Sequence, residues 1–142
     1  YKDDYGYVRC VRSGQLKIWL FNDNGNGTVS DSGTGLMWQK ATAPGTYKWK
    51  DALKYCEDLT LAGYSDWRLP DIKELSSIVD DSKYGPAIDS IYFPDTKSDW
   101  YWSSSSDASD TSFAWGVGFS YGYVDDGYKG NDNYVRCVRS GQ

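Results

Sequence analysis

An arginine and two carboxylates beside a tryptophan form the most chemistry-like cluster in the sequence. Arg68 follows Trp67, and Asp71 and Glu74 come shortly after it. Asp71 and Glu74 also have the spacing of a capping box, in which two side chains close the first turn of a helix. We therefore interpret Arg68 and Glu74 as supports for a helix start and Trp67 as a core residue. A functional site is the alternative.

Other catalytic patterns are absent from the sequence. The chain contains no histidine to act as a general base, and the serines at 103–106 have no partner residue that would activate a hydroxyl nucleophile. The adjacent Asp125 and Asp126 would point to opposite faces of an extended chain. We therefore expect a protein that is not an enzyme.

A polar loop near the N-terminal end has oxygen ligands at alternate positions. Asn22, Asn24 and Asn26 precede Gly27, as ligands do at the start of an EF-hand calcium loop. The twelfth position, where that loop needs a bidentate glutamate, is Gly33. Two Asn-Gly pairs between strand-like runs instead favour a plain β-hairpin. Calcium is the alternative, and no other cofactor is expected.

A long segment near the C-terminal end has the composition of a binding surface. Between residues 103 and 133, 22 of 31 residues are Ser, Asp, Gly, Tyr or Asn. Antibody binding loops use the same residues, because tyrosine gives rigid contact area and small polar residues give adaptable hydrogen bonds. The predicted ligand-binding residues are Tyr121, Tyr123, Asp125, Asp126, Tyr128, Asn131, Asp132 and Asn133.

Length and charge limit the organisation and the partners. A chain of 142 residues fits one domain with a real core. The net charge is −5, and residues 103–133 contain five aspartates and one lysine. Nucleic acid and anionic membrane surfaces are therefore excluded as partners. No apolar run approaches the length of about 20 residues that spans a bilayer, so we expect no direct membrane insertion.

Nine residues occur twice in the chain. Tyr7–Gln15 and Tyr134–Gln142 are identical and lie 127 positions apart. A period of this size predicts tandem copies of a whole domain. Residues 1–15 would be the tail of a preceding unit, and residues 16–142 would form one complete unit. An isolated duplicated strand is the alternative.

The two copies differ just before the identical residues. The alignment extends back to Tyr1 and Tyr128, and only Asp3–Gly6 and Gly130–Asn133 differ within it. A changeable tip with constant flanks favours a ligand-selecting loop. Drift in a solvent-exposed loop is the alternative.

The repeat also explains the odd number of cysteines. Cys10 and Cys137 occupy the same position in the two copies, which leaves Cys56 as the second cysteine of the unit. We predict a disulfide between Cys56 and Cys137, with Cys10 left without a partner. Such a bridge would stabilise the fold by about 4 kcal/mol in the chain-entropy model and implies an oxidising compartment. Three free buried thiols are the alternative.

These residues need helices and strands to position them. Alternating apolar residues predict strands at 16–21, 113–119 and 134–138, and helical spacing predicts helices at 48–59 and 72–79. Glycines on one face of the 113–119 strand would let another segment approach closely. In the last strand, Val135 and Cys137 would share the buried face. Two helices between an early hairpin and a late antiparallel sheet make an α+β plan.

Several motifs, in this order, resemble the Lcl C-terminal domain family. They are DNGNGTVSDSGTGLMWQK (23–40), ALKYC (52–56), AGYSDWRLPDIKEL (62–75), YWSSS (101–105), the strand at 115–119 and YVRCVR (134–139). The resemblance covers essentially all of 16–140. It implies a C-type-lectin-like fold of the variety seen in formylglycine-generating enzymes, with a twisted antiparallel sheet, two flanking helices and long late loops.

The resemblance also implies a function. Members of this family are modules of bacterial surface and secreted proteins that act in adhesion, including to sulfated glycans. The acidic late segment favours other ligands here. The reactive cysteine pair of the formylglycine-generating enzymes has no counterpart in this chain, so the fold carries no activity with it.

We therefore predict a non-enzymatic adhesion module that is extracellular or on the cell surface. Its expected partners are a host or neighbouring-cell surface protein or a neutral glycan, together with neighbouring units of the same chain. A stalk that spaces another domain from the cell surface and a calcium-dependent glycan-binding module are alternatives. Programmed variation by a diversity-generating retroelement is a further hypothesis, because variable proteins of these elements use this fold and vary near the C-terminus.

Overall fold

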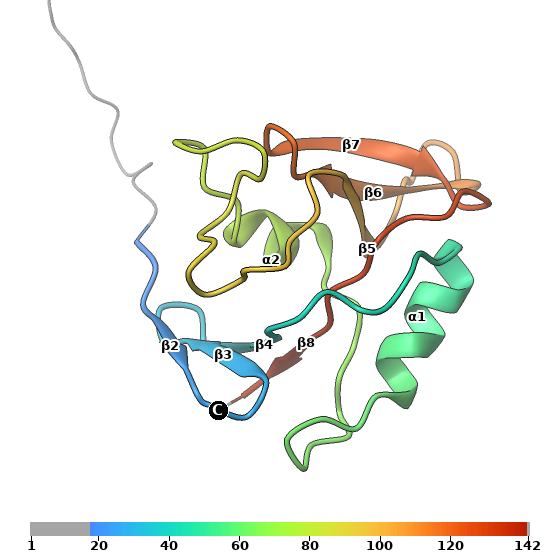
Figure 1. The fold of residues 1–142 in the computed structure, drawn as a ribbon. Helices are drawn as coiled ribbons and strands as arrows, with labels where there is room; N and C mark the ends of the chain where they lie inside the picture. Colours follow the sequence, from blue (N-terminus) through green and yellow to red (C-terminus); the bar gives the residue numbers. More distant parts are fainter. Residues whose placement is uncertain (1–17, 142) are drawn as a thin grey trace, which may run out of the picture.

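The computed structural model describes residues 18–141. Within them the chain forms two antiparallel sheets and two helices, which confirms the α+β class. The expected tail at 1–15, with Cys10, lies outside the described residues. Figure 1 shows the three-stranded sheet at the top of the view and the four-stranded sheet below it, with helix α2 between them.

The four-stranded sheet brings the two ends of the described chain together. Its strands are β2 (Phe21–Asp23), β3 (Thr28–Asp31), β4 (Leu36–Gln39) and β8 (Val138–Ser140), in the order β2-β3-β4-β8. Strands β2 and β3 form the predicted hairpin, and β8 pairs antiparallel with β4. The last strand therefore closes a sheet that the first strands begin.

The three-stranded sheet consists of consecutive strands. They are β5 (Trp100–Ser106), β6 (Phe113–Gly118) and β7 (Tyr123–Tyr128). The prediction of long loops late in the chain is wrong for the residues of β7, which form a strand. Its Asp- and Gly-rich sequence is unfavourable for a strand, but β7 pairs with β6 along its whole length.

The two helices lie close to the predicted positions. They are α1 (Trp49–Asp58) and α2 (Ile72–Ser77). The capping box at the start of α2 is present, and both Arg68 guanidinium nitrogens donate to the Glu74 carboxylate, at 2.6 and 2.8 Å. Trp67 is buried, so this cluster supports the fold, as predicted. Neither helix in the described part of the chain has the length and apolar character needed to cross a membrane.

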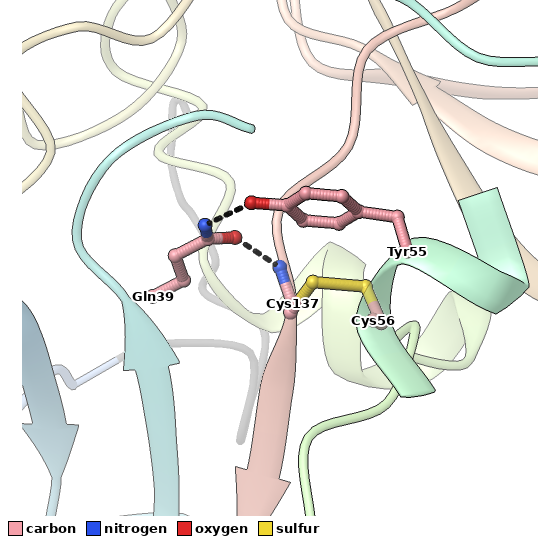
Figure 2. The surroundings of a disulfide bond; sticks show 4 residues. All are labelled: Gln39, Tyr55, Cys56 and Cys137. Carbon is pink, nitrogen blue, oxygen red and sulfur yellow. Dashed lines mark hydrogen bonds between the residues drawn. A yellow bond between two sulfur atoms is a disulfide. The ribbon is translucent and has the colours of Figure 1, made fainter. Parts of the chain in front are cut away.

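A disulfide joins α1 to the segment before β8, as predicted. Cys56 and Cys137 are bonded, and their Cα atoms are 5.6 Å apart. Figure 2 shows Gln39 beside the bridge, where its side-chain oxygen accepts from the Cys137 backbone N–H and its amide donates to the Tyr55 hydroxyl. The alternative of free thiols is wrong for Cys56 and Cys137.

The first predicted strand begins later than expected. Residues 18–20 belong to no strand, and β2 starts at Phe21. Ile18 is 70% exposed and Leu20 52% exposed, whereas the Trp19 indole turns inward and donates to the Ser77 carbonyl oxygen at 2.8 Å. The alternation is present, and the half-buried aromatic residues Trp19 and Phe21 form its less exposed side.

The last predicted strand is also displaced, because Arg136 is buried. Residues 135–137 belong to no strand, and β8 begins at Val138. Val135 and Cys137 are buried as predicted, but Arg136 between them is only 1% exposed. Strict alternation would have placed its side chain in solvent.

Hydrogen bonds explain how a guanidinium can be buried here. Arg136 donates to the carbonyl oxygens of Gln39, the last residue of β4, and of Lys40 directly after it. Its other terminal nitrogen donates to the hydroxyls of Thr42 and Thr96, at 3.2 and 2.9 Å. Burial lowers the pKa of Arg136, and these acceptors compensate for the lost hydration. The side chain thus connects the segment after β4 to the loop before β5.

Replacement of Arg136 by methionine should destabilise the protein by about 3 kcal/mol, because the buried carbonyl oxygens would lose their donors. Arg139→Met is the matched control. Arg139 pairs with Asp66, whose side chain is 62% exposed, so water already screens the pair and the loss should be much smaller. Urea unfolding of both variants checks this. Equal losses would contradict the central role of Arg136.

Candidate ligand-binding surface

The eight predicted binding residues lie along β7 and beyond both of its ends. Tyr121 and Tyr123 lie where the strand begins, Asp125 and Asp126 lie within it, and Tyr128 and residues 131–133 lie where it ends. At about 3.3 Å per residue, the two ends are roughly 17 Å apart. Adjacent strand residues point to opposite faces, so Asp125 and Asp126 do not share one face.

Three exposed tyrosines gather at the beginning of β7. Tyr84, Tyr121 and Tyr123 are 76%, 62% and 70% exposed. The ring centroids of Tyr84 and Tyr121 are 6.2 Å apart and those of Tyr121 and Tyr123 are 6.0 Å apart, with interplanar angles of 21° and 29°. We call this set the tyrosine row. Tyr84 was not among the predicted binding residues, because only the fold brings it beside residues far along the chain.

The backbone beneath the tyrosine row is tied to the core. The N–H groups of Gly85 and Ala87 donate to the carbonyl oxygens of Ser120 and Phe119, at 2.9 and 2.8 Å. Ala87 and Phe119 are both buried. The loop carrying Tyr84 is thus bonded to the turn carrying Tyr121.

Gly122 fixes the turn between β6 and β7. Its φ is +84°, and a Cβ atom at this position would lie 2.7 Å from Cγ1 of Val79. A side chain therefore fits neither the backbone conformation nor the space. The turn rests directly on the core at the end of α2, which gives the flanking tyrosines a fixed base.

Glycines on β6 and β7 accommodate a tryptophan ring, as the sequence predicted for β6. A Cβ atom at Gly116 would lie 2.7 Å from the Trp100 ring, and one at Gly127 would lie 3.5 Å from it. The same Cβ at Gly116 would come within 2.5 Å of the Tyr101 carbonyl oxygen. The absence of side chains at these glycines lets β6 and β7 pack closely against the Trp100 indole of β5.

The tip that differs between the repeat copies lies at the far end of β7. Asp132 is exposed and pairs with Lys48 at 3.4 Å. Asn131 is also exposed, whereas Asn133 exchanges two backbone hydrogen bonds with Tyr47. The tip is therefore held by backbone hydrogen bonds at its last residue, Asn133, whereas the residues before it are exposed to solvent.

A shallow hollow adjoins this tip. Its volume is about 470 Å³, and its lining residues are Lys48, Trp49, Lys50, Asp51, Lys129 and Gly130. The Lys129 ammonium lies 4.0 Å from the centre of the Trp49 ring and donates to the Ser106 hydroxyl. A Cβ atom at Gly130 would meet the Tyr128 ring. The first copy has an aspartate at the corresponding position, residue 3, and an aspartate in place of Gly130 would shift that ring.

The aspartates of β7 have different surroundings. Asp125 is exposed, and its carboxylate accepts from the backbone N–H of Asp126. Asp126 lies beside the buried Asp107, and the hydrogen-bonding contact with that carboxyl, then desolvation and the Asp107 charge, raise the pKa of Asp126. Hydrogen bonds from Ser109, and then the contact with Asp126, lower the pKa of Asp107. Asp126 is therefore the member of the pair that takes up a proton first.

The asparagines of the hairpin loop bond to one another and to nearby hydroxyls. Asn24 accepts from the Asn22 amide at 2.9 Å, and Asn26 accepts from both the backbone N–H and the hydroxyl of Thr28. These bonds are those of a closed β2–β3 turn. No cluster of three or more His, Cys, Asp or Glu side chains that could hold a metal ion occurs among residues 18–141.

Comparison with known families supports the motifs identified in the sequence. Residues 27–139, most of the chain, match the model of the Lcl C-terminal domain. The match is compatible with a C-type-lectin-like fold and includes both helices and both sheets apart from strand β2 and the final residue of β8. No curated protein gave a match.

The Asp107–Asp126 pair predicts a pH-dependent effect of Asp126→Asn. The folded-state pKa of Asp126 is raised, so at neutral pH its ionisation costs stability, and this cost disappears as the pH falls through that pKa. The variant should melt at a higher temperature than the parent at pH 7, and the difference should shrink towards about pH 4.

Thermal melts at several pH values measure this difference. Asp125→Asn is the control, since it removes the same charge from the neighbouring exposed position. If both variants gain equally at pH 7, the effect reflects net charge and not the contact with Asp107.

Proposed function

Because the chain belongs to the Lcl C-terminal domain family, we propose that it is a non-enzymatic ligand-binding module that acts in adhesion outside the cell or on its surface. The tyrosine row carries this proposal. It presents three neighbouring aromatic rings to solvent, each more than 60% exposed. The disulfide between Cys56 and Cys137 supports an oxidising location.

The rigidity of the tyrosine row favours binding. Tyrosine side chains combine apolar rings with hydroxyl groups, and they lose little conformational entropy on binding. Gly122 and the hydrogen bonds between residues 85–87 and 119–120 hold the backbone before a ligand arrives. A preorganised surface spends less free energy on ordering when it binds. The row thus has the properties of a recognition surface.

The charges around the row indicate the kind of partner. Tyr123 and Asp125 lie two residues apart in β7 and therefore share a face of the strand. Asp81 lies beside Gly122, since a Cβ there would be 3.5 Å from the Asp81 carboxylate. Aromatic rings with nearby carboxylates suit sugar hydroxyls or the cationic side chains of a protein. A surface protein or a neutral glycan is therefore the proposed partner.

The positions of the chain ends argue against a stalk. The Leu20 carbonyl oxygen accepts from Ser32, and the Gly141 N–H donates to Gly35. Both ends of the unit thus meet the same β3–β4 turn. In a tandem array, successive units would therefore add little to the distance that the chain spans. Strand β7 would point away from the junction between two units, because it lies across the molecule from the C mark in Figure 1. This arrangement suits display better than spacing.

The tip at 130–133 provides a second contact region. Its exposed residues border the hollow beside Trp49, so changes there would alter the ligand-facing surface without touching the core. Programmed variation by a retroelement and drift both predict changes at these positions. Ligand selection by the tip is the finer part of the proposal, programmed variation is its sharper form, and drift in a solvent-exposed loop is the alternative.

Simultaneous replacement of Tyr84, Tyr121 and Tyr123 by alanine should abolish ligand binding. Truncation of central aromatic contacts commonly costs more than 1 kcal/mol each, so a loss of at least about 100-fold in affinity is expected. Arrays of glycans and host surface proteins, probed with and without calcium, measure the binding. A calcium requirement would implicate the Asn22–Asn26 loop.

Tyr128→Ala is the matched control, because Tyr128 is 53% exposed but lies at the opposite end of β7. It should retain most of the affinity for any ligand of the tyrosine row. The proposal fails if the parent chain binds no ligand or if the triple variant binds as well as the parent. The stalk would then be the better account.

A further inference from the structure

The last residues of the described chain complete the fold, and we call them the closing segment. A second segment near the N-terminal end of the same chain has the same sequence. The closing segment, Tyr134–Gly141, occupies a site formed by the rest of the fold, and the second segment is Tyr7–Gly14. The positions that differ between the copies, 3–6 and 130–133, all precede it. The contacts of the closing segment therefore decide whether the other copy would fit.

Backbone hydrogen bonds hold the closing segment along its length. The carbonyl oxygens of Tyr134, Val135 and Cys137 accept from residues of β5 and of the segment around β4, at 2.9 to 3.0 Å. Val138 exchanges two backbone bonds with Arg68, and Gly141 donates to Gly35. These bonds depend on the backbone alone, so an identical sequence can form every one of them.

The side chains of the segment fit the site equally specifically. Val135, Cys137 and Val138 are completely buried, and Arg136 donates to four oxygen atoms. The corresponding residues of the first copy are Val8, Cys10, Val11 and Arg9. No buried side chain of the closing segment lacks an identical counterpart.

We propose that this site also accepts Tyr7–Gly14 from a second copy of the chain, in place of its own Tyr134–Gly141, and that Cys10 then forms a disulfide with Cys56. The exchange would link two units covalently by strand replacement. It does not depend on the tyrosine row, so the proposed ligand binding can fail while this inference stands.

The short link after the incoming segment is less restricted when the exchange joins two molecules. If Gly14 took the place of Gly141 in its own chain, four residue steps, a span of at most about 14 Å, would have to reach Ile18. Gly141 and Ile18 both lie at the β3–β4 turn, since Gly141 donates to Gly35 and a Cβ atom at Gly33 would lie 3.7 Å from the Ile18 carbonyl oxygen. The link of a molecule that replaced its own strand would be confined to this turn, whereas a second molecule has no such restriction.

The redox step needs no external oxidant. The Cys10 thiolate of one chain attacks the Cys56 sulfur in the other chain, so the Cys10–Cys56 bond forms as the Cys56–Cys137 bond breaks. Cys137 leaves as a thiolate and takes up the proton that Cys10 lost. Cys56 and Cys137 are both fully buried, so this step occurs while the closing segment is detached, during folding or local opening.

Refolding of the reduced, unfolded chain tests the exchange. At increasing protein concentration in a glutathione redox buffer, we expect a growing fraction of dimer on non-reducing gels, with a Cys10–Cys56 peptide in proteolytic maps. A mixture of unlabelled and 15N-labelled chains shows whether this peptide joins two molecules. Cys10→Ser should give monomer only. Absence of the dimer at every concentration, or a Cys10–Cys56 bond within one molecule, would overturn the proposal.

Two arginine variants distinguish strand docking from unspecific thiol chemistry. Arg9→Ala removes the guanidinium from the incoming segment and leaves the native closing segment intact, so the dimer fraction should fall at least about tenfold. Arg136→Ala weakens the resident segment and should raise the fraction. Asp4→Ala, outside the nine identical residues, should change nothing. If Arg9→Ala dimerises like the parent, cross-linking does not require the site, and the inference is wrong.

Discussion

The burial of one guanidinium determines how this fold closes. After β4 the chain leaves its sheet, and the carbonyl oxygens of Gln39 and Lys40 are satisfied by Arg136 instead of by a neighbouring strand. A buried charge without partners would cost several kcal/mol, so these acceptors must be in place whenever the closing segment is docked. A shift of one residue would put a valine or a cysteine against the carbonyl oxygens and expose them to an apolar group. Arg136 therefore fixes the register, and the disulfide at the next residue secures it covalently.

The same segment connects the two sheets and thereby supports the tyrosine row. Tyr134 exchanges backbone hydrogen bonds with Trp100 and Trp102 of β5, while β8 a few residues later pairs with β4. Trp100 in turn packs against glycines of β6 and β7. The turn that carries Tyr121 follows β6 directly and rests on the core. In the sequence the tyrosines of this surface look like loop residues. In the structure their rigidity depends on contacts that extend to the four-stranded sheet.

Local patterns in the sequence predicted much of this fold, whereas long-range contacts determined what was missed. The helices, the capping box and the glycine face of β6 follow from periodicity and spacing, and the disulfide followed from the alignment of two repeat copies. The burial of Arg136 was not predicted, because alternation places a charged residue in solvent. Only the fold shows that buried hydrogen-bond acceptors surround its side chain. Tyr84 was missed because its partners lie about forty residues away in the chain. Strand β7 was read as loop because its composition disfavours a strand, although pairing with β6 overrides that preference.

Burial explains part of the pattern of identity and difference between the two repeat copies, although exposed residues such as Ser140 are identical too. From Val135 to Val138 every side chain is buried, and each has a partner that a substitution would lose or crowd. At positions 130–132 the side chains are exposed, and a change there displaces at most the ring of Tyr128, so stability places little restriction on them. The buried segment, which stability holds constant, and the exposed tip, which stability leaves free to change, are thus separated by only two residues. Under the proposed function, selection for a ligand could act on such a tip without opposing selection for folding.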